Sequence, residues 1–202
     1  AGLFVWTGFD YLGEPAYPYP SISSSFGILD LCGFPKDVFY FYKSQWTSEP
    51  VLHLLPHWNW KEGQLIDVIA YTNCEEVKLY LNDQLIGEQA FVNTNIKYKT
   101  NQWDKIIDLG EGQKLSLDWK VPFSPGTLRA EGYKNGKIIA TDVVKTAFDA
   151  AKIELTSDRA VIQADGKDLS YLTIKIKDKD GTLVPDADNL IHFDIEGEGK
   201  IA

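Results

Sequence analysis

The sequence predicts a mainly β chain, with a β-sandwich preceded by a βα unit of a parallel barrel and followed by an incomplete immunoglobulin-like sandwich. Three observations support this fold class. An apolar run opens the chain and leads into a Pro- and Tyr-rich loop, the pattern of a strand buried on both faces. Turn signals at Asn82-Asp83 and Asn135-Gly136 separate alternating strands. The alternation restarts after Phe148, in about fifty residues, which are too few for a complete immunoglobulin-like sandwich.

The first predicted domain, residues 1–48, consists of a strand over Ala1–Trp6, a long loop and a helix over residues 33–46. Pro35 suits the first turn of this helix, and Asp37 places negative charge near its N-terminus. Spacings of three and four predict one face that packs on a barrel wall: Phe39, Tyr40, Tyr42, Lys43 and Trp46. Because one βα unit cannot bury both faces of its strand, we expect the chain to be the tail of a larger protein.

The second predicted domain, residues 49–147, follows a linker at Thr47–Pro50 and is the β-sandwich. A strand over 65–71 and an alternating strand over 115–121 accompany two hairpins, at 77–87 and 126–144. The third domain, residues 148–202, is predicted to contain a strand from Lys152, a short strand, an alternating strand at Leu172–Ile176 and a Lys-Asp-Gly turn. A further strand is expected to begin at His192–Ile195, in a domain cut off at Ala202.

Composition and charge exclude several classes of function. The formal net charge of −9 argues against a nucleic-acid partner, which requires a basic face. No stretch approaches the roughly 18 consecutive apolar residues of a membrane span.

Cys32 and Cys74 lie in different predicted domains and are expected to be free thiols. His53 and His57 are four residues apart, but Pro56 between them argues against a helix and no Cys or acid completes a metal site. We expect no metal and no cofactor.

Three stretches together resemble a known family: FVWTGFDYLGEP (4–15), SSFGILDLCGFPKDVFYFYKSQW (24–46) and HLLPHWNW (53–60). They are similar to the end of the (β/α)8 barrel in glycoside hydrolase family 2, especially its β-galactosidase-like members with extra C-terminal sandwiches. The resemblance implies the last βα unit of that barrel and retaining hydrolysis of a terminal non-reducing β-linked sugar, with galactose as the expected sugar. It also implies a periplasmic or extracellular bacterial location. In that family two glutamates on earlier strands perform the reaction, so the resemblance implies that this chain needs the N-terminal part of the same enzyme as its partner and is inactive alone.

The same resemblance assigns two substrate-binding residues. Trp6 matches the family's strand-eight tryptophan, an aromatic platform for the terminal sugar; the alternative is a packing residue of the core. Asp10, four residues later, matches the family's WxxxD spacing and could bond sugar hydroxyls or pocket residues; the alternative is a turn-forming loop carboxylate. Glu14, before Pro15, is expected to be a solvated loop residue; the alternative is a pocket acid. The loop tyrosines could form a rim or simply pack: Tyr11, Tyr17 and Tyr19.

Two other functions compete with the glycosidase fragment: a set of carbohydrate-binding modules, and a spacer built of immunoglobulin-like repeats. Sandwich folds host all three functions, but neither alternative has a use for the segment of residues 1–46. We expect Trp58 and Trp60 to join the sandwich to the barrel, the alternative being a glycan-binding aromatic patch, and Trp119 to be core. Trp103 is then the candidate for an exposed glycan-binding aromatic of the sandwich.

Overall fold

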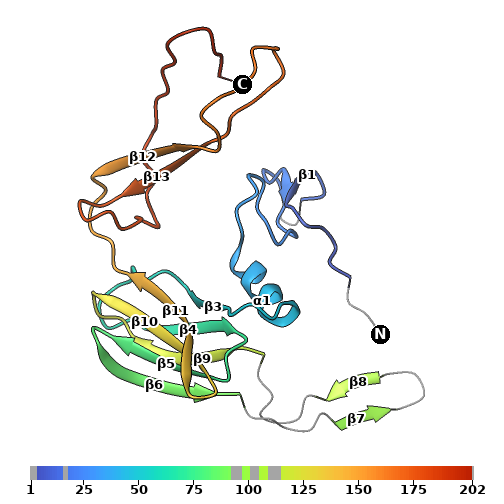
Figure 1. Ribbon diagram of the computed structural model, residues 1–202, viewed down its shortest axis with the longest axis vertical. Helices are drawn as coiled ribbons and strands as arrows, with labels where there is room; N and C mark the ends of the chain where they lie inside the picture. Colours follow the sequence, from blue (N-terminus) through green and yellow to red (C-terminus); the bar gives the residue numbers. More distant parts are fainter. Residues whose placement is uncertain (1–3, 16–17, 92–96, 101–104, 109–114, 202) are drawn as a thin grey trace. The chain divides into compact units, whose positions relative to one another are not determined.

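The computed structural model describes residues 4–15, 18–91, 97–100, 105–108 and 115–201 and confirms a mainly β fold (Figure 1). The chain divides into two compact units, Ala1–Lys145 and Thr146–Ala202. Within the described ranges, no helix has the length and apolar character needed to cross a membrane.

The first unit contains one helix, α1 (Asp37–Trp46), among its described elements. Its strands are β1 (Tyr11–Leu12), β2 (Ser23–Ser24), β3 (Leu52–Leu55), β4 (Leu65–Thr72), β5 (Glu76–Leu81), β6 (Gln84–Ala90), β7 (Lys97–Thr100), β8 (Lys105–Asp108), β9 (Leu117–Pro122), β10 (Thr127–Lys134) and β11 (Lys137–Lys145). The second unit contains β12 (Lys152–Ser157) and β13 (Leu172–Lys177).

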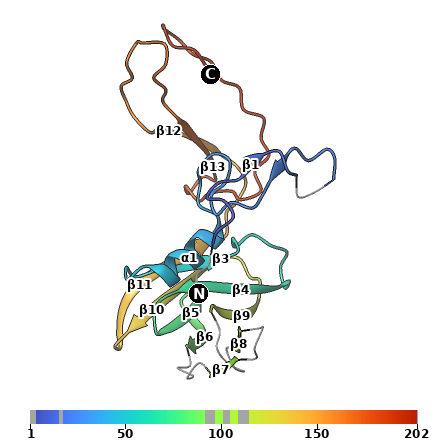
Figure 2. The same ribbon diagram turned by 90° about the vertical axis from the view of Figure 1, so that its right-hand side faces the viewer.

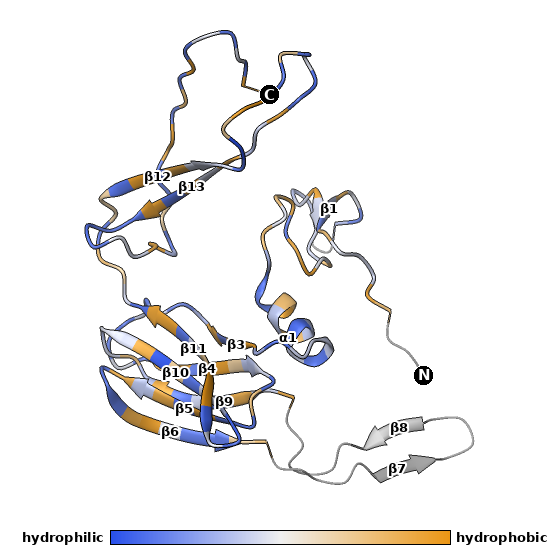
Figure 3. Cartoon of the chain, in the orientation of Figure 1, coloured by the Kyte–Doolittle hydropathy of each residue, from blue (hydrophilic) through white to orange (hydrophobic). Residues whose placement is uncertain are grey.

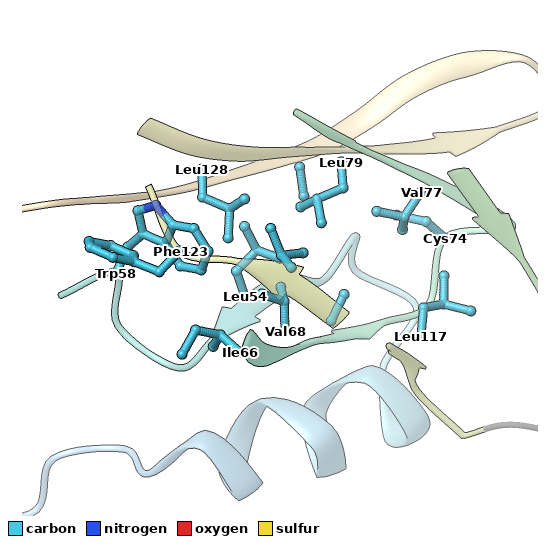
Figure 4. Close-up of a cluster of buried hydrophobic side chains, with 13 residues drawn as sticks. Leu54, Trp58, Ile66, Val68, Cys74, Val77, Leu79, Leu117, Phe123 and Leu128 are labelled. Atoms are coloured by element: carbon cyan, nitrogen blue, oxygen red, sulfur yellow. The ribbon is translucent and has the colours of Figure 1, made fainter. Parts of the chain in front are cut away.

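A β-sandwich forms the body of the first unit. A four-stranded sheet in the order β11-β10-β5-β6 packs against a three-stranded sheet in the order β3-β4-β9, and all neighbouring strands are antiparallel. Alternate residues of each strand point into the space between the sheets, for example Ile66 and Val68 from β4 and Val77 and Leu79 from β5 (Figure 4). The alternation of apolar and polar residues along these strands is visible in Figure 3 and accounts for the predicted period of two.

Both predicted hairpin turns are confirmed. Asn82 and Asp83 have φ of 49° and 64°, and Asn135 and Gly136 have φ of 51° and 70°. Two consecutive left-handed residues define the turn whose twist suits a two-residue hairpin, and Asn, Asp and Gly tolerate that conformation best. The turns therefore set the registers of β5 with β6 and of β10 with β11.

Three tryptophans whose roles the sequence predicts lie in the described part of this domain. Trp58 has no exposed surface, packs edge-to-face on Phe123 with ring centroids 5.2 Å apart, and donates its indole N–H to the carbonyl oxygen of Ser124 at 3.1 Å. It belongs to the sandwich core, so the prediction that it joins the sandwich to the barrel was wrong. Trp119 is half-buried against the same core, as expected, and Trp60 stacks on His57 with centroids 4.8 Å apart.

The helix α1 begins later than predicted. Pro35 is not in its first turn but forms a bridge with Leu29, and Lys36 is the N-cap residue. Asp37 does occupy the first turn. Tyr40, expected to face a barrel wall, instead stacks on His53 of β3, and the helix lies along β3 and β4 (Figure 2). Sequence spacing defines the face of a helix but does not identify the surface that the face covers.

The segment before α1 contains less β-strand than predicted. Residues 4–6 form no strand and take part in no strand pair of the described residues, and a strand requires a neighbour for its backbone hydrogen bonds. The strand expected over Ala1–Trp6 is therefore not found in its described part.

The second unit is built on the antiparallel pair of β12 and β13. The fully buried Asp178 accepts backbone hydrogen bonds from Phe148 at 3.0 Å, Asp180 at 2.9 Å and Thr182 at 2.8 Å, which shapes the predicted Lys-Asp-Gly turn. The short strand expected between β12 and β13 and the strand at His192–Ile195 are both absent from the described residues. Neither segment takes part in a strand pair of the described residues.

Candidate functional site

The loop that carries the predicted sugar-binding residues consists of two backbone segments that lie close together and are joined by hydrogen bonds. Leu29 donates its amide to the carbonyl oxygen of Gly8 at 3.0 Å and accepts from the amide of Asp10 at 2.9 Å, and β1 pairs with β2 beyond it. Gly27 lies in one of these segments, and a Cβ there would clash with the backbone of Phe9 and Asp10. Only glycine permits so close an approach, which holds the two segments in register.

Asp10 is held by the loop itself. Its Oδ1 accepts from the backbone amide of Gly27 at 2.8 Å and from the Lys36 ammonium at 2.7 Å. Lys36 also donates to the carbonyl oxygens of Ser25, at 3.1 Å, and Gly27, at 3.0 Å. The hydrogen bond from Lys36 lowers the pKa of Asp10 below its ordinary value of 3.8. Asp10 is therefore ionised at neutral pH and ties the loop to the N-terminal end of α1.

Trp6 lies at the surface with 78% of its area exposed, so packing within the described residues does not account for it. Its indole N–H donates to the Tyr11 hydroxyl at 3.2 Å, and that hydroxyl donates to Oε2 of Glu14 at 2.6 Å. The charge of the carboxylate strengthens the second bond and orients the hydroxyl to accept from the indole. The hydrogen-bond chain fixes the edge of the indole and leaves the ring exposed.

An open apolar hollow of about 460 Å³ adjoins the Trp6 ring. Its lining comes from the N-terminal segment, the loop and one side of α1: Phe4, Val5, Trp6, Phe26, Ile28, Val38 and Tyr42. This volume is within the range of small-molecule sites, and an apolar wall with a few polar groups at its rim is typical of them.

A first test of this arrangement follows the hydrogen bond from the Gly27 amide to Asp10 as the pH is lowered. A carboxyl whose pKa is lowered by folding stabilises the structure above its unfolded value and loses that contribution as the pH falls through the folded value. We therefore expect protection of the Gly27 amide from hydrogen exchange, corrected for the intrinsic rate, to be complete at neutral pH and to be lost only at a pH below 3.8, the ordinary pKa of the group. Mass spectrometry of the peptide spanning residue 27 in the full-length protein measures it.

In Asp10→Asn the acceptor atom is retained but the charge is lost. This variant should show weaker protection at neutral pH and no change through the acid range. The matched control is Asp83→Asn, on the exposed hairpin turn, which should behave as the unsubstituted protein. An acid transition that survives in Asp10→Asn would assign it to another group.

The remaining candidates do not form a second site in the part of the chain that is described. His53 contacts Asp37, whereas His57 stacks on Trp60, and no three His, Cys, Asp or Glu side chains gather there as a metal site would require. Cys32 and Cys74 are free thiols, and burial raises the pKa of Cys74. The predictions for Trp103 and Tyr17 lie outside the described residues, and Tyr19 is exposed.

Sequence reasoning missed Lys36, which organises the loop through three acceptors. Nothing in its local sequence distinguishes it from a solvated lysine ahead of a helix.

Comparison with known proteins identifies what these segments resemble. Residues 63–140 match a family described as a domain of unknown function (DUF4982), and residues 153–202 match glycoside hydrolase family 2 C-terminal domain 5. The β-galactosidase BoGH2A of Bacteroides ovatus is 46% identical over 204 residues, which cover 100% of this chain and 22% of that protein. A putative β-glucuronidase of Formosa agariphila is 33% identical, over 99% of this chain and 18% of that protein.

A crystal structure of a β-glycosidase from Bacteroides vulgatus superposes with a TM-score of 0.73 at 36% identity, covering 88% of this chain and 20% of the other. The chain thus spans about a fifth of the length of the curated relatives it matches.

Proposed function

We propose, from the premise that this chain belongs to the C-terminal region of glycoside hydrolase family 2 proteins, that it forms one wall of the sugar site in a retaining exo-β-glycosidase. The substrate in this proposal is a terminal β-linked galactose. The two carboxyl groups of a retaining mechanism, about 5–5.5 Å apart, are then supplied by residues outside this chain. What this chain contributes is the surface against which the sugar ring is positioned.

The exposed ring of Trp6 carries this proposal. The C–H groups of a pyranose pack on an aromatic face, and the indole edge is held by Tyr11 and Glu14, so the platform is oriented before a sugar arrives. The apolar hollow beside it offers further contact area. Tyr11 and Glu14, which are linked to the Trp6 indole by hydrogen bonds, supply polar groups for the hydroxyls of a sugar.

The charges near Trp6 favour a neutral sugar over a sugar acid. A glucuronide carries a carboxylate, and its recognition calls for a cation. Among the described residues around Trp6, the ammonium group of Lys36 is engaged by Asp10 and two carbonyl oxygens, while Glu14 adds negative charge. A carboxylate placed there would be repelled, so galactose suits this wall better than glucuronic acid.

A substrate panel tests the proposal. The full-length enzyme should hydrolyse p-nitrophenyl β-galactoside with a kcat/KM at least about tenfold above that for the glucuronide, a difference of about 1.4 kcal/mol. Steady-state rates on the galactoside, glucoside and glucuronide at one pH give the comparison. Preference for the glucuronide would show that a cation from another segment governs the site, and activity on none would contradict the assignment.

A further inference from the structure

The segment that joins α1 to the sandwich is fastened along its length. Asn73, at the end of β4, donates its side-chain amide to the carbonyl oxygens of Thr47, at 3.3 Å, and Glu49, at 2.7 Å. Its Oδ1 accepts from the amide of Val51 at 2.8 Å, and the buried Thr72 hydroxyl donates to the Val51 carbonyl oxygen at 2.6 Å. These bonds replace the free linker expected from Thr47–Pro50 with a fixed connection.

The other end of the helix is held by His53. Its Nε2 donates to Oδ1 of Asp37, in the first turn of α1, at 2.8 Å, and its ring stacks on Tyr40 with centroids 3.9 Å apart. On the sandwich side, Asp142 of β11 accepts the Leu54 amide at 2.7 Å and lies 3.8 Å from Nδ1 of His53. The imidazole is half-buried between the helix and two strands, with its ring nitrogens directed at carboxylates from both sides.

Asp37 is adjacent to the residue that holds the sugar-site loop. Lys36, the N-cap residue of α1, bonds Asp10 and the carbonyl oxygens of Ser25 and Gly27. A displacement of the first turn of the helix would move the Lys36 ammonium away from these acceptors. His53 is therefore linked to the loop by two side-chain contacts, one with Asp37 and the other between Lys36 and Asp10. Lys36 and Asp37 are neighbours in the chain.

We propose that His53 is a positioning residue, through which the β-sandwich fixes the loop of Trp6 and Asp10 for sugar binding. The expected effect on KM rests on the proposed function. The expected effect on the structure of the loop does not. The sandwich then contributes to substrate affinity from outside the sugar pocket. A sandwich that served only as a spacer would leave the loop unaffected when the contact is broken.

The experiment uses the full-length enzyme with His53→Ala, His53→Gln and the matched control His57→Ala. His57 is also a sandwich histidine stacked on an aromatic ring, but it contacts Trp60 rather than α1. In His53→Ala we expect KM for the aryl galactoside to rise about tenfold with a smaller change in kcat, because a displaced loop weakens sugar binding. Amide exchange should increase in peptides spanning residues 8–14 and 25–36 and stay unchanged in β4 and β5.

His53→Gln retains an N–H donor near Asp37 and should recover most of the loss in both measurements. His57→Ala should match the unsubstituted enzyme. Unchanged exchange at 8–14 in His53→Ala would overturn the positioning role whatever the enzyme's substrate. Increased exchange without a change in KM would overturn the link to sugar binding. Failure of the proposed function itself is recognised separately, by an absence of glycosidase activity in the unsubstituted enzyme.

Discussion

Trp6→Ala in the full-length enzyme is expected to lower kcat/KM for the aryl galactoside about a hundredfold, equivalent to about 2.7 kcal/mol of transition-state stabilisation. In the proposed function Trp6 positions the sugar ring, and a misplacement by about 1 Å is enough for a loss of this size. The ring is 78% exposed, so its removal should leave the melting temperature nearly unchanged. Steady-state kinetics and a thermal melt on the same preparation measure both quantities.

Two further substitutions make the result specific. Trp6→Phe keeps an aromatic face but loses the bond to the Tyr11 hydroxyl, and it should retain most of the activity. Trp60→Ala, a tryptophan of the sandwich stacked on His57, serves as the matched control and should be close to the unsubstituted enzyme. Normal kinetics in Trp6→Ala, or its failure to fold, would make Trp6 a packing residue, the alternative that its sequence position left open.

The features predicted correctly from the sequence are those determined by neighbouring residues. The hairpin turns follow from the tolerance of Asn82, Asp83, Asn135 and Gly136 for the left-handed conformation, and the sandwich strands follow from alternation. Trp58 was misassigned because nothing local distinguishes a core tryptophan after a turn from one at a domain junction. Its place is decided by contacts with Phe123 and Ser124, more than sixty residues away.

The candidate site likewise depends on distant contacts that the local sequence does not reveal. Trp6 and Asp10 were proposed from the family resemblance of their segment, but the groups that hold Asp10 come from residues 27 and 36. His53 was considered only as a metal ligand paired with His57, whereas its partners Asp37 and Tyr40 lie on the preceding helix. A side chain's partner across a tertiary contact leaves no periodic signal in the chain. The missing strands at 4–6 and 192–195 likewise depend on neighbouring strands, which local patterns do not supply.

The 202-residue chain by itself should hydrolyse no aryl β-glycoside. A retaining mechanism requires one carboxyl group that is protonated and one that is ionised, within one pocket. The acids of residues 4–15 are Asp10 and Glu14. Lys36 lowers the pKa of Asp10, which stays ionised, and Glu14 accepts the hydrogen bond of Tyr11. Both carboxyl groups are thus engaged by the loop, and neither lines the hollow.

Purified chain incubated with chromogenic galactoside, glucoside and glucuronide is therefore expected to match the buffer blank, with the full-length enzyme as the positive control. Asp10→Asn distinguishes true turnover from a contaminating hydrolase. Activity that disappears with this substitution would mean that Asp10 takes part in the chemistry and that Lys36 releases it when substrate binds. Activity that persists in the variant would not depend on the Asp10 carboxylate, and its loss on further purification of the chain would assign it to a contaminant.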